Sequence, residues 1–141
     1  MRWCRLRPAM PTTVPWSHEL ELMALPLSVG GARGFVTDVL TEHELAVLVD
    51  DVRLVVSELA TNALVHARTS FTVKLRTGLG PAVVLEVRDG SQSGPASVAT
   101  TPLATSGRGI AIVDALSQAR GVDEYMGGGK SVWAVFPVGL P

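Results

Sequence analysis

Three polar residues, Glu58, Asn62 and His66, recur at intervals of four in an otherwise apolar stretch of the sequence. On an α-helix, residues four apart are offset by only about 40° around the axis, so these side chains would project from nearly one face. A carboxylate and an amide beside an apolar face lower stability unless they find a partner. Taken alone, the pattern has two interpretations: the solvated edge of an amphipathic helix, which is the commoner case, or a polar site.

A carboxylate at the end of an expected strand is the second candidate. Asp89-Gly90 follows the apolar segment 82–88 and precedes a stretch with few apolar residues. Asp-Gly is a common turn former, and this is the simpler interpretation of the pair by itself. An ionised aspartate accepts hydrogen bonds only, so it could select adenine through the exocyclic amino group, where guanine presents a carbonyl.

A glycine pair opens the next expected helix, in the segment Ser106-Gly107-Arg108-Gly109-Ile110. Glycines let the backbone approach a ligand closely, and the first N–H groups of a helix suit phosphate oxygens. Arg108 could add a charge-assisted contact. A single Gly-x-Gly is nevertheless a plain loop as often as a phosphate cradle.

A second glycine-rich segment, Gly127-Gly128-Gly129-Lys130-Ser131, superficially resembles a P-loop. The P-loop motif needs a glycine where Glu124 stands, and it needs a helix where a strand is expected here. We therefore predict a hairpin turn, from which the Ser131 hydroxyl could reach the floor of a pocket.

The elements that would position these residues follow from hydrophobic periodicity. Strands and helices come in groups and do not alternate strictly, which favours an α+β fold. We predict a two-layer α/β sandwich, with helices on one face of a mixed, mostly antiparallel sheet. The expected strands are 18–27, 71–76, 82–88, 121–125 and 131–137, and the expected helices are 32–41, 44–67 and 109–116. The long loop 90–106 is a candidate lid.

Composition bounds the class of protein. The chain has 141 residues, 47% hydrophobic but only 5% aromatic, so we expect one core of small and branched aliphatic side chains. Its net charge of -1 provides no field to attract nucleic acid or a membrane. With a single cysteine, Cys4, and no window of about 20 apolar residues, we expect a cytoplasmic protein. Residues 1–16 are expected to be a poorly ordered leader before a domain at 17–137.

In combination, the motifs resemble those of the GHKL ATPase superfamily. Segments 57–67 (Ser-Glu-Leu-Ala-Thr-Asn-Ala-Leu-Val-His-Ala) and 129–133 (Gly-Lys-Ser-Val-Trp) are most similar to the small bacterial anti-sigma-factor serine/threonine kinases. The resemblance covers roughly residues 17–137 and implies the histidine-kinase-like (Bergerat) fold with its left-handed crossover. The superfamily pattern Asp-x-Gly-x-Gly is here Asp89-Gly90-Ser91-Gln92-Ser93, with serine at both glycine positions.

The same resemblance implies a role for each matching residue. Glu58 would orient or deprotonate the nucleophile, Asn62 would hold Mg²⁺ through its side-chain oxygen, and Asp89 would bind the adenine amino group. Ser131 would support Asp89, and His66 would line the pocket edge. The positions expected to bind the ATP cofactor are Asn62, Ala63, His66, Asp89, Gly90, Gly107, Arg108, Gly109, Ile110 and Ser131.

We therefore expect an ATP- and Mg²⁺-dependent protein serine/threonine kinase that regulates transcription. Its partners would be an anti-sigma-factor antagonist, which it phosphorylates, and a sigma factor; a homodimer is left open. A non-catalytic, ATP-dependent protein-binding regulator is the alternative. The catalytic fragment of a histidine kinase is a third interpretation, which we disfavour because residues 1–16 leave no room for a phosphoacceptor helix.

Overall fold

The computed structural model describes residues 14–78, 80–90 and 107–138, with the backbone alone described at 107–110. Most of the expected leader and of the expected lid therefore lies outside the described residues. The described elements, in chain order, are β1 Ser17–Leu22, α2 Leu27–Glu42, a 3-10 turn at Ala46–Leu48, α3 Val49–His66, β2 Phe71–Thr77, β3 Ala82–Asp89, α5 Gly107–Leu116, β4 Ala119–Glu124 and β5 Lys130–Pro137.

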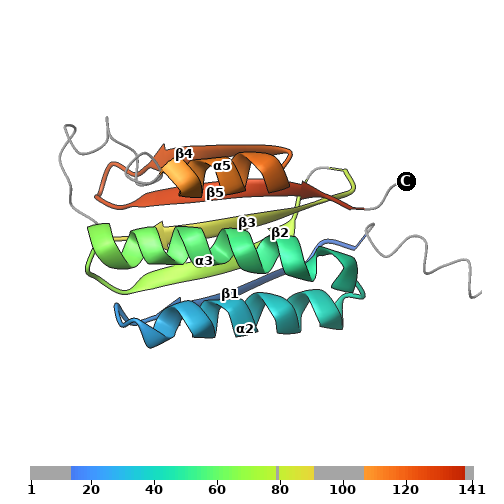
Figure 1. Ribbon diagram of the computed structural model, residues 1–141, viewed down its shortest axis with the longest axis horizontal. Coiled ribbons are helices and arrows are strands. Elements are labelled where there is room, and N and C mark those ends of the chain that lie inside the picture. The colour runs from blue at the N-terminus through green and yellow to red at the C-terminus, as the bar shows by residue number, and fades with distance from the viewer. Residues whose placement is uncertain (1–13, 79, 91–106, 139–141) are drawn as a thin grey trace, which may run out of the picture.

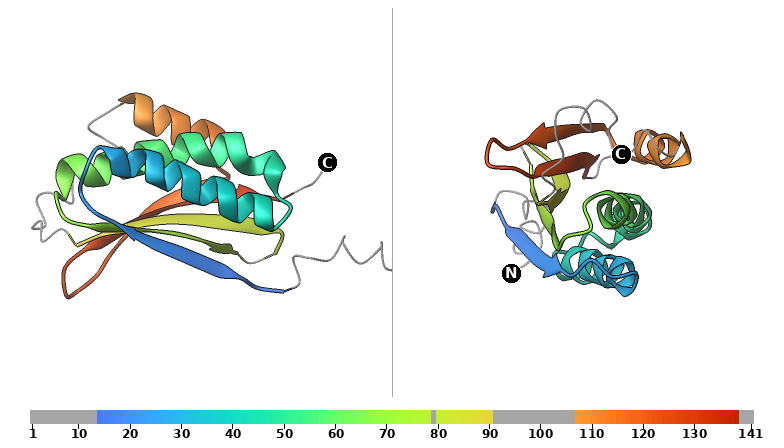
Figure 2. Two further views of the ribbon diagram at one scale, coloured as in Figure 1. Left: turned by 90° about the horizontal axis from the view of Figure 1, so that it is seen from below. Right: turned by 90° about the vertical axis from the view of Figure 1, so that its left-hand side faces the viewer.

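The five strands form one sheet in the order β1-β2-β3-β5-β4, and every neighbouring pair is antiparallel. The three helices cover one face of this sheet, with α3 between α2 and α5 (Figures 1 and 2). The predicted two-layer α+β sandwich is thus confirmed.

The core forms where the helix layer meets the sheet. Alternate residues of each strand point to the same face, so Val83, Leu85 and Val87 of β3 share the helix-facing side. Each of these three is at most 2% exposed. Phe71 and Phe136 are the largest fully buried side chains, and the other large ones are Leu and Val. The aliphatic core expected from the composition is therefore present.

Three element boundaries differ from the prediction by more than two residues: the end of the first strand (predicted at 27), the start of the first helix (predicted at 32, observed at Leu27) and the start of the second helix (predicted at 44). The first strand ends at Leu22, because Pro26 forms the N-terminal cap of α2 and Leu27 is already helical. Proline suits the start of a helix, since its missing N–H would be unpaired there in any case. Helix α3 begins at Val49 and not at Glu44, because Glu44 turns the chain with a φ of 58°.

The remaining elements lie within two residues of their predicted positions, including the hairpin turn at Gly127-Gly128-Gly129. No helix in the described part of the chain is long and apolar enough to cross a membrane.

Candidate functional site

Helix α3 carries Glu58, Asn62 and His66, which together we call the polar ladder. Glu58 is half-buried, Asn62 is buried at 9% exposure, and His66 in the last turn is exposed. Ala63, beside Asn62, is 5% exposed and belongs to the core. The ladder is therefore not simply the solvated edge of an amphipathic helix, because its central residue, Asn62, is buried.

The orientation of the Asn62 amide is fixed by a hydrogen bond. Its Nδ2 atom donates to the backbone carbonyl of Glu58, one turn earlier, at 3.0 Å. A carbonyl can only accept, so the amide must present its NH₂ group to Glu58. The side-chain oxygen of Asn62 consequently faces away from that bond and can accept from, or coordinate to, something else.

Asp89 is the last residue of β3 and is only 4% exposed. Strand alternation places it on the helix-facing side with Val87 and Leu85. In the register between β3 and β5 it lies opposite Lys130. The Lys130 Nζ atom is 3.7 Å from the Asp89 Oδ2 atom, and both side chains are largely buried. The carboxylate therefore has a charged neighbour on one of its two oxygens.

The glycine turn between β4 and β5 closes tightly onto Asp89. Gly129 has a φ of 97°, and a Cβ atom at this position would lie 2.7 Å from the backbone oxygen of Asp89. A side chain here would meet both a clash and an unfavourable backbone conformation. The turn needs glycine at this position because it packs against the end of β3.

The structure places Ser131 apart from Asp89. Ser131 lies opposite Arg88, on the sheet face without helices, and its Oγ atom donates to Glu86 Oε2 at 3.2 Å. Lys130 occupies the position facing Asp89 instead. The alternation of Val132, Ala134 and Phe136, which face the core, would have assigned Lys130 to their face and Ser131 to the other.

The start of α5 at Gly107 places the Gly-x-Gly pair in the first helical turn. Figure 1 shows this helix start at the same end of the molecule as the end of α3, the end of β3 and the β4–β5 turn. The side chains of Arg108 and Ile110, and Ser106 as a whole, lie outside the described residues. Their predicted contacts with phosphate stay predictions.

A hollow of about 280 Å³ lies beside Asp89 and Gly90 at this end of the sheet. Its walls are mainly polar and come from β1, β2, β3 and the β4–β5 turn. The lining residues are Glu21, Thr69, Ser70, Thr72, Arg88, Asp89, Gly90 and Gly128. Thr72 and Arg88 alternate with the buried residues of their strands, so this hollow lies on the sheet face without helices, whereas the Asp89 side chain lies on the helix-facing side.

The fold and these residues define a nucleotide-binding domain of the GHKL type, with one helix layer on an antiparallel sheet. The family model of the histidine kinase-like ATPase domain matches residues 22–136, and the chain belongs to this family. Membership implies that the domain binds ATP. No curated protein matches the sequence significantly.

Proposed function

We propose that this domain is a regulatory protein kinase, which transfers phosphate from ATP to a serine or threonine of an anti-sigma-factor antagonist. We also propose that it binds a sigma factor. The observation that carries the proposal is the buried Asn62 amide, which donates to the backbone carbonyl of Glu58 and is thereby held with its oxygen directed away from that bond. Membership of the histidine kinase-like ATPase family implies that the domain binds ATP.

The arrangement of α3 fits a magnesium site. Mg²⁺ prefers oxygen ligands and is usually bound by one or two protein groups together with substrate phosphates. The Asn62 side-chain oxygen is such a ligand, and its hydrogen bond to Glu58 fixes its direction. When bound, the ion would neutralise charge on the phosphates during transfer.

The nucleotide would be held from three sides. Asp89 would accept a hydrogen bond from the adenine amino group, with Lys130 as its charged neighbour. Backbone N–H groups at the start of α5, Gly107 to Ile110, would contact the phosphates. Ala63 and His66 would line the pocket along α3.

Glu58 would act as the base in the transfer step. Its carboxylate takes the proton of the partner's hydroxyl group as the hydroxyl oxygen forms a bond to the γ-phosphorus of ATP. The bond between this phosphorus and the β–γ bridging oxygen breaks, and ADP leaves. This chemistry needs mainly positioning and charge neutralisation, which a helix-borne carboxylate and amide can provide.

The test is phosphate transfer from labelled ATP to candidate antagonist proteins, with the wild type, Glu58→Ala and Asp51→Ala. Asp51 is an exposed carboxylate near the start of the same helix and serves as the matched control. We expect Glu58→Ala to lower the transfer rate by about 10²- to 10⁴-fold, as is typical for loss of a general base. Asp51→Ala should behave like the wild type.

The non-catalytic alternative gives different results. ATP binding without transfer to any antagonist, and regulation that survives in Glu58→Ala, would reject the kinase and favour a binding regulator.

A further inference from the structure

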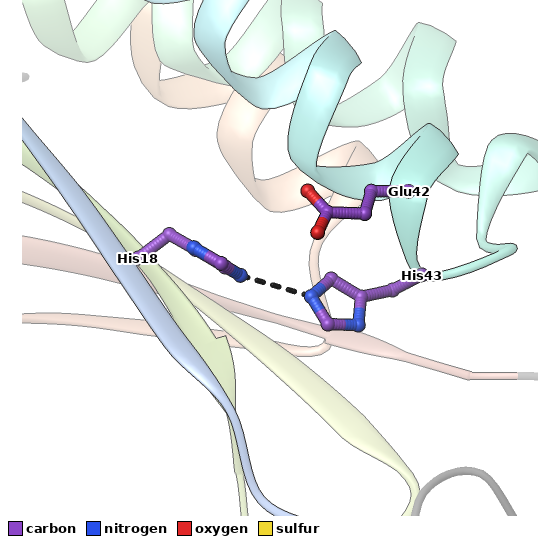
Figure 3. A group of neighbouring side chains, drawn as sticks. All are labelled: His18, Glu42 and His43. Atoms are coloured by element: carbon purple, nitrogen blue, oxygen red, sulfur yellow. Dashed lines mark hydrogen bonds between the residues drawn. The ribbon is translucent and has the colours of Figure 1, made fainter.

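A second cluster of metal-ligating side chains lies away from the nucleotide site. His18, Glu42 and His43 bring one ligand atom each to within 4.8 Å of one another. Figure 3 shows the two imidazole rings facing each other and the Glu42 carboxylate directed towards them. These residues come from β1 and from the end of α2, so only the folded chain assembles them.

The fold positions each of the three residues. β1 is an edge strand, and His18 lies opposite the buried Leu75 of β2, which places its side chain under the helix layer. Glu42 is the last residue of α2, and His43 is its C-terminal cap. The C-terminal end of a helix carries a partial negative charge, which favours a cation there.

The two imidazoles are held in place by their neighbours. The His18 Nε2 and His43 Nε2 atoms are 2.9 Å apart, and the Trp16 ring stacks on His43 with 4.0 Å between centroids and 10° between planes. The Trp16 backbone is itself hydrogen-bonded to Thr77 at the end of β2. Ligands that are ordered before a metal arrives lose little conformational freedom on binding it.

We propose that His18, His43 and Glu42 form a binding site for a Zn²⁺-class cation. Zinc binds imidazole nitrogen at about 2.0–2.1 Å and carboxylate oxygen at a similar distance. A tetrahedral angle then separates two ligand nitrogens by about 3.4 Å. The observed 2.9 Å separation reaches this value by a movement of about half an ångström. Three protein ligands leave the fourth position to water.

This site is independent of the proposed kinase activity. In Figure 1 the end of α2 and the start of β1 lie at the opposite end of the molecule from the end of β3. The register agrees, because Ser17 pairs with Arg76 at one end of β2, whereas Asp89 pairs with Phe71 at the other. A bound cation would tie the edge strand β1 to α2.

Calorimetric titration of the full chain with Zn²⁺ tests the proposal. The Cys4→Ser background removes the only thiol, and His66→Ala removes the one histidine outside the cluster. We expect one Zn²⁺ per chain. Loss of groups that merely support a ligand typically lowers metal affinity by 10- to 100-fold, so His18→Ala and His43→Ala should each weaken binding by at least about 100-fold. His66→Ala should bind as the wild type does.

A second measurement does not depend on the folding of the His18→Ala and His43→Ala variants. Trp16 contacts His43, so Cu²⁺ bound in the cluster should quench its emission, and removal of Cu²⁺ with a chelator should restore it. Trp133→Phe removes the other described tryptophan and should leave the quenching in place. Failure of Zn²⁺ to bind the folded chain, or binding that is unchanged in both His18→Ala and His43→Ala, would overturn the proposal.

Discussion

At the scale of single residues, the carboxylate of Asp89 has a charged neighbour in Lys130. The Lys130 Nζ atom lies 3.7 Å from one oxygen of this carboxylate, and both side chains are largely buried. Breaking a buried ion pair by removing one partner is costly, because the other charge is left without compensation. Any test of Asp89 must therefore separate nucleotide binding from the stability of the pair.

We predict that Asp89→Asn weakens ATP binding by about 10- to 100-fold, the loss expected for a hydrogen bond to a charged group. The variant should also be less stable, since Lys130 then faces a neutral amide. The double variant Asp89→Asn/Lys130→Met should recover stability but not ATP binding. Calorimetry with ATP and urea unfolding measure the two effects, and recovery of ATP binding in the double variant would contradict the adenine role.

A second prediction tests whether Asn62 binds Mg²⁺. Asn62→Ala removes the amide oxygen and should lower ATP affinity in the presence of Mg²⁺ by about tenfold or more, with a small effect when Mg²⁺ is chelated. Thr61→Ala, at the exposed neighbouring position, is the control. Equal losses with and without Mg²⁺ would indicate that Asn62 serves the nucleotide or the helix and not the ion.

At the scale of elements, the β4–β5 turn packs closely against the end of β3. We predict that Gly129→Ala lowers the free energy of unfolding by at least about 1–2 kcal/mol, because alanine tolerates a positive φ poorly and its Cβ would contact the backbone of Asp89. ATP affinity should fall with it. Gly127→Ala is the control, since a Cβ at Gly127 has open space. Urea unfolding and calorimetry on both variants check the prediction.

The elements were largely predictable from the sequence, because hydrophobic periodicity reports which face of a helix or strand is buried. The β2–β3 hairpin and the ladder on α3 follow directly from such patterns. The boundaries at Pro26 and Glu44 were missed, since one proline can close a strand or open a helix and a single positive φ leaves no periodic trace.

Contacts between elements were harder to predict from the sequence. Pairing of Lys130 with Asp89 depends on the register between β3 and β5, which one sequence does not specify. The alternation along β5 predicts only that Lys130 lies on the core-facing side of its strand. The cluster of His18 and His43 joins two elements through the tertiary fold. Neither histidine stands in a metal-binding spacing, so no local pattern indicated the site.

At the scale of the whole molecule, Phe71 and Phe136 are the largest fully buried side chains in a core that is otherwise aliphatic. Phe136 is 1% exposed and lies opposite Val83, near the C-terminal end of β5. We predict that Phe136→Ala lowers the free energy of unfolding by about 3–5 kcal/mol, whereas Phe136→Leu loses less because most of the volume is kept. Denaturant unfolding of both variants measures this difference, provided that the free energy of unfolding falls with denaturant concentration at the same slope in each.

Such a loss is a large share of the roughly 5–15 kcal/mol that stabilises a typical domain. Binding of ATP to the folded state should offset part of it, because ligand binding shifts the unfolding equilibrium by mass action. A melting temperature of Phe136→Ala that does not respond to ATP would show that the substitution reaches the nucleotide site.

Helix α3 supplies both core residues and the polar ladder, and this leaves it few positions that contact neither. The exposed positions of α3 outside the ladder form a limited set: Asp50, Asp51, Leu54, Thr61 and Val65. In evolutionary terms, we expect neutral substitution in this helix to concentrate in that set. Lineages descended from this chain should therefore diverge at Asp51 or Leu54 long before they diverge at Ala60 or Asn62.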